Sequence, residues 1–273
     1  MLMRVMRLIV ALLTVIVTIV FVTMFTYVNI SKDKTIPVIT METEQIDVSV
    51  KATDEELLQG VTAFDEKDGD ISSRLLVESI SKFTTVGYAK MKYVVTDLDN
   101  HVVTATRVVH YTDYTPPKFT MNSSLVFSVY EEIVTKGIIG ATDAIDGDIS
   151  KNIILYSPDY EEGKEGDYTI QATVTNSKGD TSIISLPMSV ERIAREAPEI
   201  ILHNYLIYIK KGDSVDYSKY IKQTIDSYGV ETDLKIQVQT DFVKNKEGMF
   251  TVDYYGTDSY GRKGHTALIV IAE

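Results

Sequence analysis

Two acidic segments have the residue types and spacing best suited to chemistry in this sequence. Their carboxylates recur 78 residues apart, as Asp65, Asp68, Asp70 and Asp143, Asp146, Asp148. Calcium takes six to eight oxygen ligands and is often held by Asp-rich loops, so each segment is a candidate calcium site. The spacing differs from an EF-hand, however, because no glutamate lies twelve residues from the start of the loop.

A tight turn explains the same residues without a metal. In such a turn Asp68 and Asp146 accept hydrogen bonds from backbone amides, and the following glycine takes a positive φ. Ile71 and Ile149 then return to the core to start the next strand. We favour the turn, and we therefore expect no cofactor.

A group of tyrosines in the last third of the chain is the second candidate site: Tyr205, Tyr208, Tyr217, Tyr220 and Tyr228. Tyrosine offers a flat apolar face and a hydroxyl group, which suits contacts with sugars or peptides. The alternative is that tyrosine is a good strand residue and that half of these side chains fill the core.

Composition and motifs argue against an enzyme. The chain has four His but no His-Glu-x-x-His motif, and it has no Gly-x-Ser-x-Gly elbow, Walker loop or Rossmann fingerprint. With no Cys, it has no disulfides, thiol catalysis or Cys-based zinc site. The net charge of −12 repels phosphate backbones, so we expect neither nucleic acid nor nucleotide as a partner.

The elements that position these residues are strands with one buried face. Small or apolar residues occupy every second position from Gly87 to Asp97, and the pattern recurs at 166–176 and 248–258. Turn residues follow each run, and the segments 102–111, 181–190 and 265–272 are predicted hairpin partners.

Proline marks the boundaries between copies of this pattern, because it cannot donate a ladder hydrogen bond. The predicted repeats are residues 36–113, 115–192 and 197–273. Repeats of this length suit small antiparallel β-sandwiches of about seven strands. The fold class is therefore all-β, with three tandem Ig-like sandwiches, and the short linkers predict an extended rod with limited bending.

These motifs resemble the bacterial Ig-like repeats named after a pesticidal crystal toxin. The resemblance rests on Asp-x-x-Asp-Gly-Asp-Ile, then Gly-x-Tyr-x-Val-x-Tyr, then Thr-Asp-x-x-Gly-Asn, and on the Thr-Pro-Pro junction at 115–117. It covers residues 36–273, although the third repeat lacks the Asp-Gly-Asp turn and the first has Ala89 where the family favours Tyr. It implies extracellular or envelope modules that act as spacers or adhesive units, without catalytic chemistry or a required metal.

A membrane segment precedes the repeats. Residues 8–30 contain no charged side chain, and 23 residues of helix span about 35 Å, enough for a hydrocarbon core of about 30 Å. A cleaved signal peptide is the competing interpretation, but this stretch is longer than a usual signal and lacks an Ala-x-Ala-like cleavage site. Arg4 and Arg7 before the segment nearly balance Lys32 and Lys34 after it.

The sequence thus predicts a single-pass cell-membrane protein. Residues 1–7 form a short cytoplasmic tail, 8–30 lie in the lipid bilayer as a signal anchor, and 31–273 are extracellular. The predicted function is a non-enzymatic stalk or spacer of the cell envelope. The alternative is an adhesive module whose distal tyrosines bind cell-wall glycan or an envelope protein.

Overall fold

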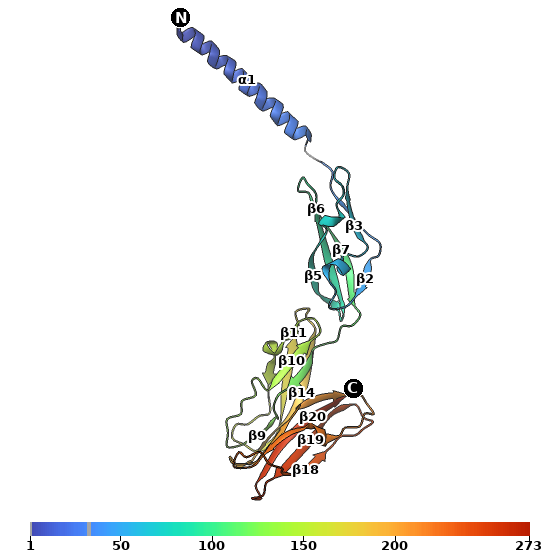
Figure 1. The fold of residues 1–273 in the computed structure, drawn as a ribbon, viewed down its shortest axis with the longest axis vertical. Coiled ribbons are helices and arrows are strands. Elements are labelled where there is room, and N and C mark those ends of the chain that lie inside the picture. The colour runs from blue at the N-terminus through green and yellow to red at the C-terminus, as the bar shows by residue number, and fades with distance from the viewer. Residues whose placement is uncertain (1, 32–33) are drawn as a thin grey trace. The chain divides into compact units, whose positions relative to one another are not determined.

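The computed structural model describes residues 2–31 and 34–273, so Lys32, used above for orientation, lies outside the described residues. The chain divides into two compact units (Figure 1). The first comprises residues 1–84 and 88–111, and the second comprises 112–273 together with 85–87. Strands dominate both units, and within residues 2–31 and 34–273 the one long helix is at the N-terminal end.

Helix α1 (Leu2–Ser31) contains the predicted membrane segment. Its apolar part, Met3–Val28, is long and apolar enough to cross a membrane and is not buried by the rest of the chain, properties that a signal sequence shares. Its threonine hydroxyls are satisfied inside the helix, since Thr14 and Thr18 donate to the carbonyls of Val10 and Thr14 at 2.8 and 2.7 Å. This back-bonding makes threonine compatible with an apolar surrounding.

The first unit contains a three-stranded sheet β1-β3-β4 and a four-stranded sheet β2-β7-β6-β5. Its elements after α1 are β1 (Val38–Met41), β2 (Gln45–Val48), α2 (Asp54–Leu57), β3 (Val61–Asp65), β4 (Gly69–Asp70), η1 (Ser72–Arg74), β5 (Leu76–Thr85), β6 (Tyr88–Thr96) and β7 (Val102–Tyr111).

The second unit contains two further sets of the same kind. The first set has sheets β11-β10-β8 and β12-β13-β14-β9, and the second has β15-β17 and β16-β20-β19-β18. The elements of the first set are β8 (Lys118–Met121), β9 (Val126–Ser128), β10 (Ile139–Asp143), β11 (Gly147–Asp148), η2 (Ser150–Asn152), β12 (Ile154–Tyr156), β13 (Gly166–Thr175) and β14 (Thr181–Glu191). Those of the second are β15 (Glu199–Leu202), β16 (Leu206–Ile209), η3 (Tyr217–Tyr220), β17 (Ile221–Ile225), β18 (Lys235–Thr240), β19 (Gly248–Thr257) and β20 (Lys263–Ala272).

The order of the four-stranded sheet therefore recurs three times along the chain. In one respect the predicted antiparallel pairing is wrong. In each of the three four-stranded sheets, the strand that comes first in the chain pairs in parallel with the strand that comes last. These pairs are β2–β7, β9–β14 and β16–β20. The parallel strand is possible because the chain passes through the smaller sheet before it returns to the larger one.

The period-two pattern correctly identifies the core. Ala89, Met91 and Tyr93 on β6 have no exposed surface, and Val252 and Tyr254 on β19 are equally buried. Each of the two tyrosines places its hydroxyl on a backbone carbonyl, from Tyr93 to Leu57 at 2.8 Å and from Tyr254 to Tyr217 at 2.9 Å. A fully buried tyrosine with a satisfied hydroxyl fixes the sheet against the short helix that supplies the carbonyl.

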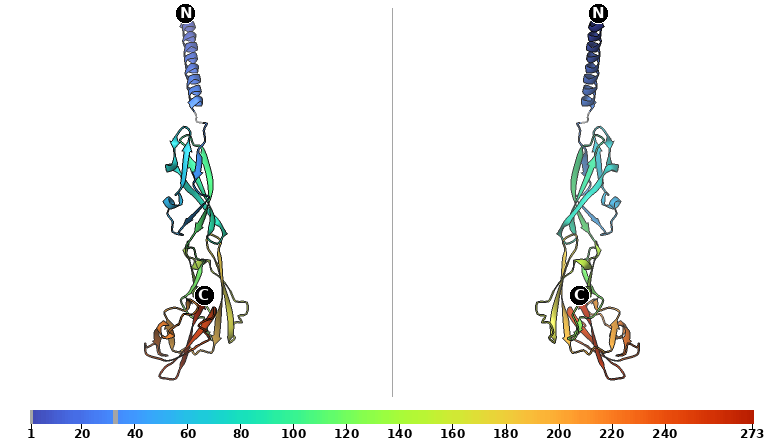
Figure 2. Two further views of the ribbon diagram at one scale, coloured as in Figure 1. Left: turned by 90° about the vertical axis from the view of Figure 1, so that its right-hand side faces the viewer. Right: turned by 90° about the vertical axis from the view of Figure 1, so that its left-hand side faces the viewer.

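Residues 115–192 and 197–273 pack against each other within the second unit, which corrects the rod predicted for these two segments (Figures 1 and 2). Phe119 N donates to Tyr208 Oη at 3.2 Å, and Ala267 N donates to Ser124 Oγ at 3.0 Å. One apolar cluster includes residues of both segments. A short linker between repeats does not keep them apart when each has apolar surface to bury against the other.

Candidate functional site

The first carboxylate of each acidic segment closes a tight turn. Asp65 Oδ1 accepts hydrogen bonds from the amides of Lys67 and Asp68 at 2.8 and 3.0 Å. Asp143 Oδ1 makes the same pair of contacts at 2.9 and 3.0 Å. Both side chains are buried, so these amide contacts satisfy charges that water cannot reach.

The second carboxylate of each segment joins this turn to the next hairpin. Asp68 Oδ2 accepts from the amide of Leu98 at 2.8 Å, and Asp146 Oδ2 accepts from the amide of Ser177 at 2.6 Å. The intervening glycine, Gly69, has φ of +78°, a conformation that disfavours other residues. The turn that we favoured from the sequence therefore accounts for these residues.

The third carboxylate caps the turn that follows. Asp70 Oδ1 accepts from the amide of Ser72, and hydrogen bonds from Ser72 hold the pKa of Asp70 below its usual range. Asp148 does the same with Ser150. Ile71 and Ile149 are buried as expected, but they lead into the short helices η1 and η2 and not directly into strands. The hydrogen bonds of the serines favour a helical turn at this point.

Calcium binding at these turns stays a prediction to be tested. Among the described residues, no group of three or more His, Cys, Asp and Glu side chains is arranged to hold a metal ion.

We expect Asp68→Ala and Asp146→Ala each to lower the free energy of unfolding by about 1 kcal/mol, because each leaves a backbone amide without its acceptor. The measurement is thermal melting with calcium and with chelator. A midpoint several degrees higher in calcium, lost in both variants, would overturn the metal-free turn.

The five candidate tyrosines do not form one surface. Tyr205 is a core residue whose Oη accepts from the amide of Leu202 at 3.1 Å, and Tyr208 packs under Lys118. Tyr217 and Tyr220 are half-buried in η3 against the core. Tyr228 alone is exposed, and it contacts Tyr260 edge to face. The alternative, that these residues mainly serve packing, holds for all but Tyr228.

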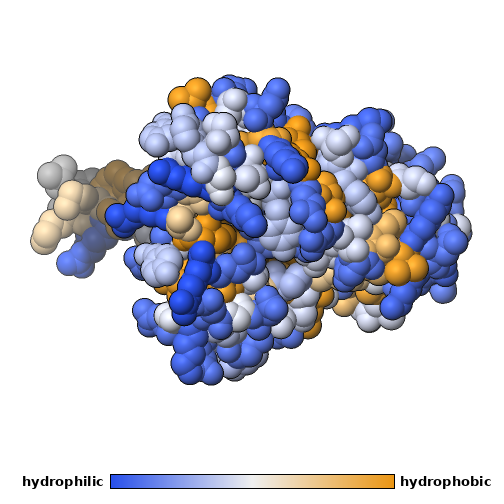
Figure 3. All heavy atoms as spheres, turned by 90° about the horizontal axis from the view of Figure 1, so that it is seen from below, coloured by the Kyte–Doolittle hydropathy of each residue, from blue (hydrophilic) through white to orange (hydrophobic). Residues whose placement is uncertain are grey.

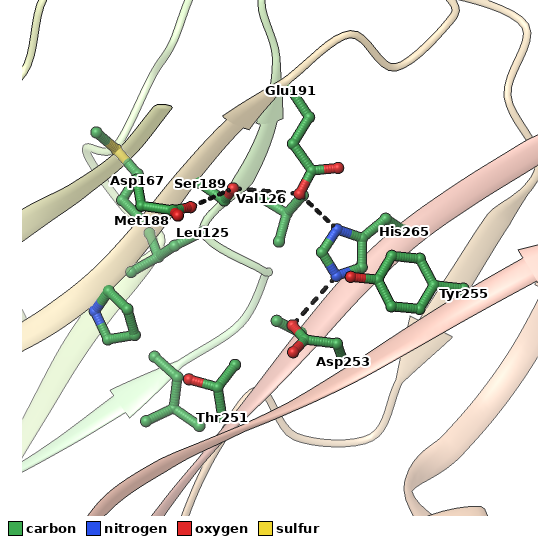
Figure 4. A pocket seen from close by; sticks show the side chains of 13 residues that line it. Leu125, Val126, Asp167, Met188, Ser189, Glu191, Thr251, Asp253, Tyr255 and His265 are labelled. Carbon is green, nitrogen blue, oxygen red and sulfur yellow. Dashed lines mark hydrogen bonds and ion pairs between the residues drawn. The ribbon is translucent and has the colours of Figure 1, made fainter. Parts of the chain in front are cut away.

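A different site lies in the second unit, where β14 of one sheet faces β19 and β20 of another (Figure 4). A cavity of about 420 Å³ opens there. Its apolar wall consists of Leu125, Val126, Pro187, Met188, Ala267 and Ile269. Its polar wall consists of Asp167, Ser189, Glu191, Thr251, Asp253, Tyr255 and His265. No local sequence pattern indicates this site, because its residues come from strands far apart in the chain.

His265 is the centre of the polar wall. Nδ1 lies 2.9 Å from Glu191 Oε1, Nε2 lies 3.2 Å from Asp253 Oδ1, and the ring stacks on Tyr255 with centroids 4.3 Å apart. The side chain is only 7% exposed. Burial by itself would lower its pKa, but the hydrogen bonds and charges of Asp253 and Glu191 outweigh burial and raise the pKa of His265 to about 9.

The charges of the cavity follow from this network. A doubly protonated His265 donates from both ring nitrogens, which fits two carboxylate acceptors. The hydrogen bonds and charge of His265 lower the pKa of Glu191. Ser189 Oγ lies 3.0 Å from Asp167 Oδ1 and 3.1 Å from Glu191 Oε1, and so extends the network to a third carboxylate. The wall thus brings three acidic side chains together with one histidine.

Comparisons with known proteins give a distant likeness only. No family model matches the chain. The chain is 30% identical over 128 residues to an uncharacterized 81.3 kDa protein of Acholeplasma phage L2. This match covers 45% of this chain but only 17% of the phage protein.

Among solved structures, the chain is similar to that of CBM51-2 in complex with GlcNAc and INT domains from Clostridium perfringens ZmpB. The sequence identity is 15% and the TM-score is 0.30, and the match covers 57% of this chain and 42% of that chain. It is also similar to Drosophila N-cadherin EC1-4, at 13% identity and a TM-score of 0.24 over 88% and 67%. TM-scores this low do not assign a fold family or a function.

Proposed function

We propose that the chain is a single-pass membrane protein that displays non-catalytic Ig-like modules outside the cell. The observation that carries this proposal is α1, whose apolar stretch Met3–Val28 is not buried by the rest of the chain and precedes β-structure up to Ala272. An apolar helix of this length is stable in a bilayer, where its backbone groups are satisfied internally.

Two further observations support the modular part of the proposal. The strand order of the larger sheet recurs three times, which fits three tandem Ig-like sandwiches at 36–113, 115–192 and 197–273. The resemblance of the acidic turns and Gly-x-Tyr strands to bacterial Ig-like repeats fits the same assignment. In this proposal the modules act as a spacer that holds the second unit away from the membrane.

Protease treatment of intact cells tests the topology. With one epitope tag at each end, we expect protease to remove the C-terminal tag and leave the N-terminal tag protected, because the modules are outside and the short tail is inside. Untreated membranes should contain both tags on one uncleaved chain. Protection of the C-terminal tag would refute the orientation, and loss of the N-terminal tag from untreated membranes would indicate a cleaved signal sequence.

Ligand binding is the second candidate function, and the cavity of the second unit favours it. Binding sites are commonly concave, with an apolar lining and a few convergent polar groups, and cavities of 300–1,000 Å³ are typical. The cavity beside His265 has this size and has convergent polar groups, and six of its thirteen lining residues are apolar. The surface at the lower end of Figure 1 is mostly hydrophilic, with hydrophobic residues in small separate patches (Figure 3).

A further inference from the structure

The cavity between β14 and the β19–β20 hairpin has more acceptors than donors. His265 uses Glu191 Oε1 and Asp253 Oδ1, and Ser189 reaches Asp167 Oδ1. The second oxygen of each carboxylate receives no hydrogen bond from any residue that the structure describes. A carboxylate oxygen only accepts when ionised, so a ligand that complements this wall must bring N–H or O–H donors.

The charge of the wall selects among such donors. Three acidic side chains and one histidine line this wall, so acidic groups outnumber basic ones there. The side chains of Glu191 and Asp253 are 35% and 29% exposed, so a ligand can reach them from solvent, although they are partly shielded from it. Partial burial strengthens the attraction for a cation relative to bulk water and disfavours an anion.

The apolar residues that line the cavity indicate what accompanies the cation. Pro187 is exposed and Val126 is half-buried, so both present apolar surface to the cavity, whereas Leu125, Met188 and Ile269 are almost fully buried. Tyr255 adds an aromatic ring beside the carboxylates. Figure 4 shows the carboxylates of Asp167, Glu191 and Asp253 around the opening, with Tyr255 against His265. An apolar stem with a cationic head can contact these apolar side chains and the carboxylates at once.

We propose that this cavity binds an organic cation, a guanidinium or primary ammonium group on a short apolar stem. This inference deepens the binding function proposed above and does not depend on membrane orientation. The same chemistry occurs in the arginine or lysine side chain of a partner polypeptide and in an amino sugar. A guanidinium offers several donors in one plane, which suits carboxylates converging from two strands.

Calorimetric titration of the full chain, in nanodiscs of uncharged lipid, tests the proposal. The probes are Nα-acetyl-arginine amide, Nα-acetyl-lysine amide and glucosamine, and the neutral comparators are Nα-acetyl-citrulline amide and N-acetylglucosamine. We expect at least one cationic probe to bind with a Kd of about 1 mM or tighter, and its neutral comparator to bind at least tenfold more weakly. Binding of the amino acid amides indicates a polypeptide partner, whereas binding of glucosamine alone indicates an amino sugar, and both support the cation site.

Asp167→Asn is the matching variant, because Asp167 lies at the solvent-exposed end of the network and does not contact His265. It should weaken cation binding about tenfold without changing the melting midpoint, whereas Asp233→Asn, an exposed carboxylate outside the cavity, should change neither. Raised salt should weaken the binding as well. Equal binding of charged and neutral probes, or no binding of any cation up to about 10 mM, overturns the inference. Neither result affects the protease test of membrane orientation.

Discussion

Raising the pH from about 6 to about 9.5 should lower the free energy of unfolding of the second unit by on the order of 3 kcal/mol. The pKa of His265 rises from its ordinary value of 6.5 to about 9 in the folded chain. A raised folded pKa means that protonation stabilises the folded state, so the stabilisation is fully present below pH 6.5 and disappears as the pH passes through 9. The groups facing the imidazole are Glu191, Asp253 and Tyr255.

Denaturant unfolding at a series of pH values measures this effect. The chain has no Trp and 17 Tyr, so tyrosine fluorescence or circular dichroism is the signal. His265→Gln keeps a polar side chain but cannot be protonated, and its stability should vary less between pH 6 and pH 9.5. The buried tyrosines and the lysines also titrate at high pH, and comparison with this variant removes their contribution. Identical pH dependence in both proteins would show that folding does not raise the pKa of His265.

The sequence predicts the strands and turns better than the sites, for a physical reason. A buried face and a turn are local patterns, so the alternation around Tyr93 and the glycine in each acidic turn are visible within about ten residues. Glu191 and His265 meet although they are 74 residues apart, and nothing near either residue indicates the other. His265 alone is an ordinary polar residue on a predicted strand.

The tyrosines illustrate the same limit. Tyr205 and Tyr228 are the same residue type in one predicted region, yet one is buried and the other is 62% exposed. Tyrosine suits both a core and a binding surface, so its type does not decide which role it has. The side-by-side packing of the two segments in the second unit was likewise hidden, because it depends on which apolar surfaces meet after each sheet has formed.

Replacing Tyr254 by alanine should destabilise the second unit by about 3–5 kcal/mol, the largest effect that we expect from a single substitution. Tyr254 has no exposed surface, and it packs on β19 within the apolar cluster that joins the two segments. Its removal leaves a cavity and also leaves the carbonyl of Tyr217 without its donor. Tyr254→Phe keeps the ring and loses only this hydrogen bond, so it should cost about 1 kcal/mol. Denaturant unfolding of the three proteins measures the difference.

Tyr93→Ala is the matched control, because Tyr93 is as buried as Tyr254 and likewise donates to a backbone carbonyl of a short helix, but lies in the first unit. Hydrogen–deuterium exchange read by mass spectrometry locates the loss of protection. Tyr254→Ala should expose peptides within 112–273, whereas Tyr93→Ala should expose peptides within 34–111. If either substitution deprotects both regions equally, the two units unfold as one, and a buried tyrosine stabilises more than the sheet that contains it.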